Sequence, residues 1–336
     1  MSRVSLAVLG ALAALALLVV VAFSVGRFPV SAGELAGILW AKLTGTGHGL
    51  DPAIETVILQ IRGPRVAAAL LIGAALAAAG AAYQNMFRNP LVSPDILGVS
   101  AGAAVGAVLG IFLSLNVIMI QSLAFAFGLA AVGLVYITAN AVRGHDPLLV
   151  LVLAGVVVGS LLGACVALMK YLADPYNQLP AITFWLLGSL ASAAPADVWS
   201  TLPLMLVGLA PMWLLRWRIN LLSLDDEEAR ALGVETGRIR LVVIAAATLM
   251  TSAAVAISGV IGWIGLVIPH FARMIVGPDF SRLLPASVLL GAAFLLGVDT
   301  LARTAARIEI PLGVLTAFVG TPLFLWQLAA ARRGWQ

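Results

Sequence analysis

The chain contains very few of the residues from which catalytic and metal-binding sites are usually built. Its 336 residues include one cysteine and three histidines, and only 10% of them are charged. Because Cys165 has no second cysteine to pair with, an internal disulfide is excluded, and this residue is expected to fill a small buried space. The sequence has no phosphate-binding loop, no HExxH, no GxSxG and no cysteine cluster. We therefore expect neither covalent catalysis nor nucleotide hydrolysis, and no cofactor or metal bound by this chain.

A polar stretch long enough to form a soluble domain is also missing. The composition is 62% hydrophobic and the mean hydropathy is +1.09, whereas a soluble domain is roughly half apolar and about a quarter charged. The sequence therefore predicts a single transmembrane domain over residues 1–336. The net charge of +4 is better explained by arginine-rich loops facing anionic lipid than by a nucleic-acid partner.

Long apolar runs fill most of the sequence and predict an all-α, polytopic membrane protein. A membrane helix needs about 20 apolar residues. Ten runs meet this requirement: 5–26, 64–86, 95–113, 118–141, 147–170, 196–216, 238–258, 260–276, 283–303 and 312–331. The first is longer than the apolar core of a signal peptide, which favours an uncleaved span. The eighth is interrupted by Gly262, Gly265 and Pro269.

Ten spans place both termini on the same side of the membrane. A cytoplasmic amino terminus puts most of the 19 Lys and Arg residues inside, as the positive-inside rule requires. Two segments would then lie outside. Residues 29–60 suggest a short interfacial helix that begins after Ser31, and the apolar segment 181–191 is too short to span and suggests a re-entrant or interfacial helix.

The stretch 84–106 predicts a tight hairpin between the second and third spans. Pro90 and Pro94 lack backbone donors and push the preceding residues out of the helical region. Glycines spaced by four residues follow on one helix face, where they allow another helix to approach closely. The glycines predicted to mediate helix packing are Gly98, Gly102, Gly106, Gly110, Gly155, Gly159 and Gly163.

Residues 223–234 predict a short capped helix in the largest cytoplasmic loop. Ser223 is the expected N-cap, the following acidic residues suit the positive end of the helix dipole, and Gly233 suits its left-handed end. A helix of about nine residues is marginal alone, so it either binds a partner or lies as a solvated helix on the surface. The residues of interest are Ser223, Leu224, Asp225, Asp226, Glu227, Glu228, Ala231, Leu232 and Gly233, of which Leu224, Ala231 and Leu232 could form a docking face.

Two arginine pairs lie at the predicted outer surface. Arg62 and Arg65 precede the second span, and Arg303 and Arg307 end the ninth. Long basic side chains at span ends often only snorkel to lipid headgroups. The alternative is a dock for carboxylates of an external partner, which arginine binds with bidentate geometry.

Two further polar residues lie within predicted spans. Asp299 is a candidate functional carboxylate, since such groups are costly in lipid, but a structural pair with Arg303 one turn later explains it equally well. His270 has no second ligand at metal-binding spacing, so we expect a hydrogen-bonded structural residue.

The hairpin FRNPLVSPDILGVSAGAAVGA resembles the permease family of type II ABC importers, which carry iron–siderophore, haem, cobalamin and related chelates. The similarity extends along the chain through IRGPRVAAALLIGAALAAAGAAYQ, ITFWLLGSLA, LSLDDEEARALGV, ISGVIGWIGLVIPHFARMIVGPD and IEIPLGVLTAFVGTPLFLWQL. Two positions depart from the family pattern: Gly63 replaces the usual Leu, and Trp263 stands where Phe is common.

The resemblance implies a homodimer of ten-span subunits, or a heterodimer, with the pathway along the dimer interface. It also implies two cytoplasmic ATPase subunits, which bind ATP and Mg, and an external bilobed substrate-binding protein. Residues 223–234 would be the coupling helix, and residues 181–191 would be the outer half-helix that follows the fifth span. Arg62 and Arg65 match positions that pair with carboxylates of the binding protein, whereas Arg303 and Arg307 are proposed by position only.

The expected function is ATP-driven import of an iron chelate by alternating access, in the inner membrane of a bacterium or archaeon. Haem, cobalamin and molybdate are alternative cargoes. An ion-coupled secondary transporter would need several midspan titratable groups, and an integral-membrane enzyme would need clustered polar groups at one face. Asp299 alone meets neither requirement.

Overall fold

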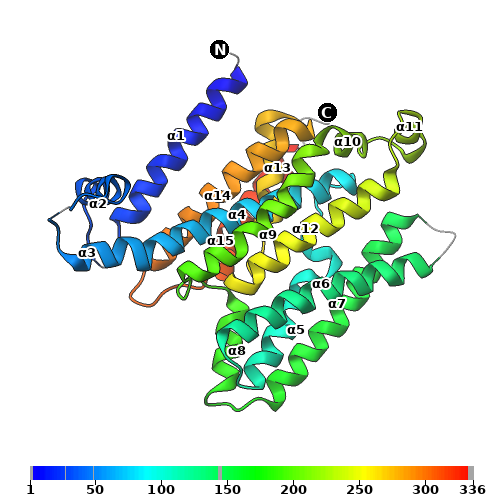
Figure 1. Cartoon of the computed structure of the whole chain (residues 1–336). Helices are drawn as coiled ribbons and strands as arrows, with labels where there is room; N and C mark the ends of the chain where they lie inside the picture. Colours follow the sequence, from blue (N-terminus) through cyan, green and yellow to red (C-terminus); the bar gives the residue numbers. More distant parts are fainter. Residues whose placement is uncertain (1–2, 27, 48, 143–145, 332–336) are drawn as a thin grey trace.

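The computed structural model describes residues 3–26, 28–47, 49–142 and 146–331, and every regular element within them is helical (Figure 1). Six helices of this part are long and apolar enough to cross a membrane. They are Pro52–Met86, α6 (Val117–Ala141), α7 (Pro147–Leu172), α9 (Pro195–Leu214), α12 (Thr236–Ser258) and α14 (Phe280–Thr304). The all-helical membrane fold predicted from the sequence is therefore confirmed.

The other four predicted spans are helices with shorter apolar stretches in the described residues. They are α1 (Arg3–Ser24), α5 (Val99–Phe112), α13 (Ile264–Val276) and α15 (Leu312–Ala331). The predicted third span began too early, because Pro94–Leu97 forms a separate 3-10 turn, η2, that Gly98 ends at φ 77°. The predicted eighth span also began too early, since α13 starts only at Ile264, after a non-helical segment.

The second span is longer than predicted. Helix α3 (Pro52–Thr56) continues through a π-helical turn, η1 (Val57–Arg62), into α4 (Gly63–Met86), and the whole extends over 35 residues. The prediction placed the helix start at Pro64 because proline favours a first turn. Here the wider π turn, closed by Gly63 N–H to Ile58 O, precedes the proline and accommodates its missing donor.

Helix α4 runs through the middle of the bundle, between α14 and α13 on one side and α9 and α12 on the other (Figure 1). Two glycine pairs bring backbones into direct contact there. A Cβ added to Gly73 would lie 2.2 Å from Gly291 O of α14, and one added to Gly80 would lie 2.0 Å from Gly265 O of α13. Such close approach is how helices pack tightly in lipid.

The glycines singled out in the sequence divide into two groups. Gly102, Gly106 and Gly110 of α5 face α6 so closely that an added Cβ would lie 2.5, 2.2 and 3.0 Å from its nearest atoms. Gly155 contacts Ile96 O in the same way, at 2.1 Å. A Cβ added at Gly159 or Gly163 has nothing within 4 Å, although Gly159 lies near Gly98, where an added Cβ would be 3.8 Å from Gly159 Cα. Close helix packing through Gly159 and Gly163 stays a prediction.

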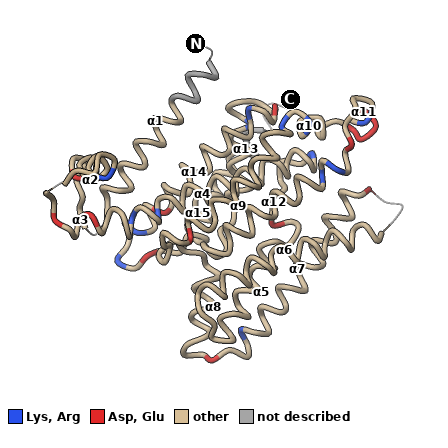
Figure 2. Tube along the Cα trace, in the orientation of Figure 1, with Lys and Arg blue, Asp and Glu red and all other residues tan. Residues whose placement is uncertain are grey.

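Most charged residues lie near the two ends of the bundle (Figure 2). One end, here named the α2 end, carries α2 (Ala32–Thr44), α3 and α8 (Gln178–Leu187). Ser31 and Glu34 form a capping box at the start of α2, where the sequence predicted that helix. The predicted outer half-helix 181–191 is instead α8, which ends at Gly188 because φ there is 72°. The opposite end, named the α11 end, carries α10 (Arg216–Leu221) and α11 (Asp226–Ala231).

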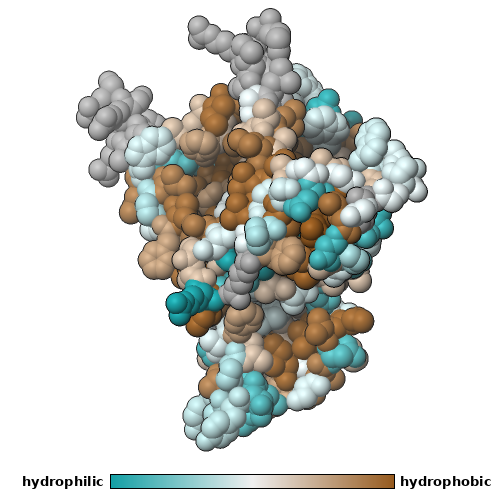
Figure 3. All heavy atoms as spheres, turned by 90° about the vertical axis from the view of Figure 1, so that its left-hand side faces the viewer, coloured by the Kyte–Doolittle hydropathy of each residue, from teal (hydrophilic) through white to brown (hydrophobic). Residues whose placement is uncertain are grey.

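The surface between the two ends is hydrophobic. Large apolar side chains such as Ile137 on α6 and Val157 on α7 are exposed, and the face in Figure 3 carries broad hydrophobic patches. Lipid chains are the expected neighbours of such a surface.

The glycine contact between α4 and α13 can be tested by adding one methyl group. Gly80→Ala should lower the free energy of unfolding by about 1–3 kcal/mol, because the added Cβ overlaps Gly265 O. The measurement is thermal unfolding of the purified protein in detergent. Gly163→Ala is the matched control, since its methyl group has nothing within 4 Å and should leave stability unchanged or slightly raised. Equal melting temperatures for the two variants would contradict the packing described.

Candidate functional site

The segment predicted as the coupling helix forms a shorter helix than expected. Helix α11 spans Asp226–Ala231, six residues, and Asp225 occupies its N-cap position. Ser223 is not the cap: its hydroxyl donates to Asn220 O at 2.7 Å, so it closes the preceding turn instead. Gly233 does adopt the left-handed conformation, with φ 81°, as its position after the helix predicted.

The acidic side of α11 is held by two arginines from other helices. The Arg240 guanidinium of α12 donates to both carboxylate oxygens of Asp226, at 2.9 Å from Nη1 to Oδ2. Arg88, just after α4, pairs with Asp225. Partial burial raises the pKa of Asp226, but the hydrogen bond and charge of Arg240 outweigh it and the pKa lies below its usual range. This contact therefore contributes stability above about pH 4 and loses it as the pH falls through the lowered pKa.

The opposite side of the segment divides into buried and exposed residues. Ala229 and Val234 are buried and fasten it to the bundle, whereas Leu232 is 61% exposed. Ala231 and Gly233 are exposed beside Leu232, and Leu224 is half-buried. The structure thus exposes one large apolar side chain, Leu232, directly after a short helix held by ion pairs. Docking of a partner protein on this segment stays a prediction.

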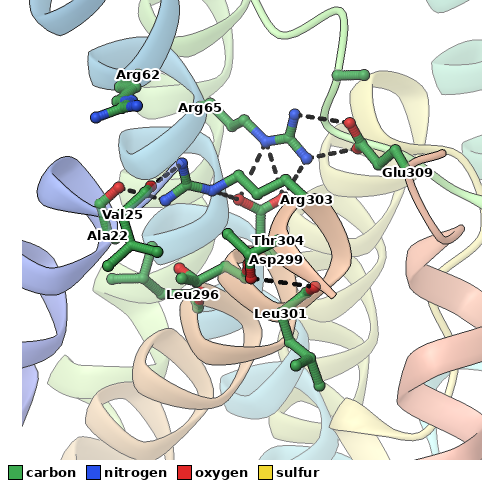
Figure 4. A network of polar contacts seen from close by, with 12 residues as sticks. Ala22, Val25, Arg62, Arg65, Leu296, Asp299, Leu301, Arg303, Thr304 and Glu309 are labelled. Atoms are coloured by element: carbon green, nitrogen blue, oxygen red, sulfur yellow. Dashed lines mark hydrogen bonds and ion pairs between the residues drawn. The ribbon is translucent and has the colours of Figure 1, made fainter. Parts of the chain in front are cut away.

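At the α2 end, Arg62 and Arg303 cap the carboxyl end of α1, and Figure 4 shows the contacts of Arg303 with Ala22 and Val25. The Arg62 guanidinium donates to Phe23 O and Phe28 O, and that of Arg303 donates to Ala22 O and to Val25 O at 2.9 Å. The last carbonyls of a helix have no intrahelical partner and form the negative end of its dipole, so cations stabilise them. Arg62 is only 6% exposed, which differs from the lipid-facing side chain that its sequence position suggested.

Arg65 lies between two carboxylates. Its guanidinium donates to Asp299, at 3.0 Å from Nε to Oδ1, and to Glu309, at 3.1 Å from Nη1 to Oε2. The Asp299 side chain is 1% exposed and that of Glu309 is 25% exposed. Arg303 also approaches Asp299, with 3.8 Å from Nε to Oδ2. The predicted Asp299–Arg303 pair is therefore present, but Arg65, which the sequence did not connect with Asp299, makes the closer contact.

A hollow of about 570 Å³ opens beside this cluster, and Arg62, Arg65, Arg303, Arg307 and Glu309 contribute to its lining. Together with Asp299, the cluster contains four guanidinium groups and two carboxylates, so its net charge is positive. Docking of an external partner on these arginines stays a prediction. The structure does change which arginine a partner would reach. Arg62 and Arg303 bind carbonyls at the end of α1, and Arg65 contacts Asp299 and Glu309. Arg307 is the exposed one of the four.

A second hollow, of about 720 Å³, is lined almost wholly by apolar groups. Leu187 of α8, Trp263 and Phe318 of α15 contribute, and no charged side chain lines it. Trp263 has φ 73°, a strained value for a bulky residue. Its ring meets Phe324 edge to face, with centroids 6.4 Å apart. The sequence analysis missed this hollow because its walls come from segments that are distant in the chain.

No group of three or more His, Cys, Asp and Glu side chains within the described residues could hold a metal ion. His270 does not show the hydrogen bond expected for it: its Nδ1 is buried and has no partner in the described part of the chain.

Residues 14–330 match the FecCD transport family, and the chain belongs to this family. It is 39% identical over 315 residues to the molybdate import system permease protein MolB of Haemophilus influenzae, covering 94% of this chain and 93% of that protein. It is also 39% identical over 306 residues to the cobalamin import system permease protein BtuC of Halobacterium salinarum, covering 89% and 81%. Other relatives are named for hemin in Yersinia pestis and for Fe(3+)-citrate in Bacillus subtilis.

Among solved structures, the chain resembles an ABC transporter described as of metal-chelate type, in an inward-facing conformation. The TM-score is 0.87 at 37% identity, covering 96% of this chain and 98% of that one. The chain is thus the permease of a type II ABC importer, a membrane subunit that is not itself an enzyme. The resemblance seen in the sequence motifs is confirmed.

The buried ion pair predicts a large effect of a single charge change. Asp299→Asn should lower the free energy of unfolding by about 3 kcal/mol, because it leaves the Arg65 guanidinium with less compensation in a buried site. Glu55→Gln is the control: its partner Lys42 lies 2.9 Å away, but the Lys42 side chain is 59% exposed. That exposed pair should contribute only about 0–1 kcal/mol. Thermal unfolding in detergent measures both.

Replacing both partners separates the charge effect from packing. Arg65→Met combined with Asp299→Leu should be more stable than Asp299→Asn alone, since the Arg65 charge is removed together with its most buried partner. Of the remaining groups, Arg303 keeps its bonds to the α1 carbonyls, and the Glu309 side chain is 25% exposed. A double variant that is less stable than the single one would contradict this account.

Proposed function

We propose that this chain carries iron chelates of the siderophore type across the inner membrane. In this proposal it acts as a homodimer, with a substrate-binding protein at the α2 end and two ATPase subunits, which bind ATP and Mg, at the α11 end. Alternating access would move the cargo along the interface between the two copies.

The main observation in favour of a chelate cargo is the apolar hollow lined by Trp263 and Phe318. A metal inside a chelate is already coordinated, so a permease needs no ligands for it and can let a bulky complex pass along apolar walls. The hollow has about 720 Å³ in one subunit and no charged lining residue. Weak contacts favour release, since a tightly bound cargo would not leave.

Molybdate is the second candidate, because the molybdate permease of Haemophilus influenzae is 39% identical over 94% of this chain. A bare oxyanion is usually held by cations or by backbone N–H groups at helix termini. Residues at the starts of two helices do line the apolar hollow, Gly313 and Val314 of α15 and Trp263 before α13, but no charged side chain does. The lack of a lining cation favours the chelate.

The cargo is tested by expressing the chain with its neighbouring ATPase and binding-protein genes in cells that lack their own importers. We expect uptake of radiolabelled iron presented as a hydroxamate siderophore, and no uptake of radiolabelled molybdate. Binding of each compound to the purified binding protein, measured by calorimetry, should give the same order. Molybdate uptake without iron uptake would replace the first candidate by the second.

The two ends of the molecule should bind different partners. Leu232→Asp at the α11 end should weaken ATPase association by about tenfold or more, the effect of an interfacial apolar residue worth about 1.4 kcal/mol. Arg307→Glu at the α2 end should weaken binding-protein association, and more strongly at low salt. Each association can be measured by surface-immobilised binding to the permease in nanodiscs.

Each variant is the control for the other end. Leu232→Asp should leave binding-protein association unchanged, and Arg307→Glu should leave ATPase association unchanged. Lys42→Glu, an exposed charge change on α2 that does not line the arginine hollow, should affect neither. If Arg307→Glu has no effect at any salt concentration, the arginine hollow is not the docking site.

A further inference from the structure

Gln84 and Asn85 are consecutive amide residues in the last turn of α4, and the function proposed above assigns them no part. Their exposed fractions are 1% and 6%. Burying an amide is unfavourable unless it is hydrogen-bonded. Successive residues of a helix point about 100° apart, so the two side chains reach different neighbours.

Asn85 holds the segment that leads into α11. Its Nδ2 donates to Ile219 O of α10 at 2.6 Å, and Ile219 is completely buried. Arg88 pairs with Asp225 at the start of α11. The end of α4 therefore contacts the α10–α11 segment at two points, one buried and one at the surface.

Gln84 holds α13. Its Nε2 donates to Leu266 O at 2.9 Å, and since a carbonyl oxygen can only accept, the amide nitrogen must face Leu266. Gln84 Oε1 is buried and has no partner within the described residues. The amide is thus only half satisfied, and its oxygen could accept a donor that it lacks in this conformation.

Helix α13 has the features of an element that can pivot. The segment before it contains positive φ values, 67° at Gly259 and 73° at Trp263. Pro269 lies inside the helix, so one hydrogen bond of its first turn is missing. The close contact of Gly80 with Gly265 provides a fixed point, and Gln84 contacts α13 one turn of α4 beyond it.

Trp263 connects α13 to the apolar hollow. The N–H groups of Leu266 and Val267 donate to Trp263 O at 3.1 and 2.8 Å, so a rotation of α13 carries the Trp263 backbone with it. The indole lines the hollow and lies against Gly320, where an added Cβ would be 2.8 Å from Trp263 Cβ. A small displacement at Leu266 would therefore change the wall of the hollow.

We propose that Gln84 and Asn85 are positioning residues that transmit motion of the α10–α11 segment through the last turn of α4 to α13 and Trp263. The inference rests on the proposed function, in which the ATPase subunits move α11. It assigns a role to the first residues of the 84–106 stretch, which would act by linking two helices and not by contacting cargo.

The test uses the complete permease–ATPase complex in liposomes, in a Cys165→Ser background. A bimane label on Phe318→Cys reports on the hollow, because Phe318 and Trp263 both line it and tryptophan quenches bimane at short range. ATP with vanadate should change the fluorescence of the otherwise unmodified complex. Asn85→Leu and Gln84→Met remove one hydrogen bond each with little change in volume.

In both variants the fluorescence change should fall by about fivefold or more, while basal ATP hydrolysis stays within about twofold. Gln327→Met is the matched control, since Gln327 is also buried but its amide has no partner among the described residues; it should keep the full change. Uptake of iron–siderophore per ATP hydrolysed should fall in parallel.

A full fluorescence change in either variant, as in Gln327→Met, would overturn the inference. So would failure of both variants to assemble with the ATPase, because that outcome makes the amides structural. Absence of any ATP-dependent change in the unmodified complex would instead count against the proposed function. A normal fluorescence change without iron uptake would count against the cargo alone and leave the transmission intact.

Discussion

The contact of α4 with α14 and α13 through glycine backbones is the constraint on which the rest of the structure depends. Between helices in lipid there is no hydrophobic drive, so tight association requires surfaces that can approach closely. Gly73 against Gly291 and Gly80 against Gly265 provide this. The same helix carries Arg65 near the α2 end and Arg88 just past its other terminus. Both charged ends of the molecule are consequently positioned by one buried, tightly packed helix.

The positions of the helices could be predicted because the length of an apolar run is a local property, and the same holds for the Ser31–Glu34 capping box. Contacts between residues that are distant in the sequence could not be predicted. Arg65 and Asp299 are separated by 234 positions, and nothing in the periodicity of either segment pairs them. An arginine at a span end normally extends to headgroups, so burial of Arg62 follows only from the distant carbonyls that it caps. The glycine spacing similarly defines a helix face but not its neighbour, so it could not say which of these glycines would contact another helix within the chain.

The arrangement separates charge from the apolar hollow. Ion pairs hold the α11 segment at the surface and the arginine cluster at the α2 end, and the hollow lined by Trp263 and Phe318 carries no charge. Buried charges would bind an ionic cargo tightly or demand compensation. An apolar wall of this kind offers weak, nonspecific contacts to a molecule that passes along it.

The capping of α1 has a consequence for how the chain is made. Its last carbonyls accept hydrogen bonds from Arg62, which is 39 positions beyond Phe23, and from Arg303, which is 281 positions beyond Ala22. Because the chain enters the membrane in order of synthesis, the first helix to be inserted keeps unsatisfied carbonyls until α14 arrives. Helix α1 is therefore synthesised first, but the hydrogen bonds at its carboxyl end are among the last to form. A chain that stops before α14 would lack the bonds from Arg303 to α1.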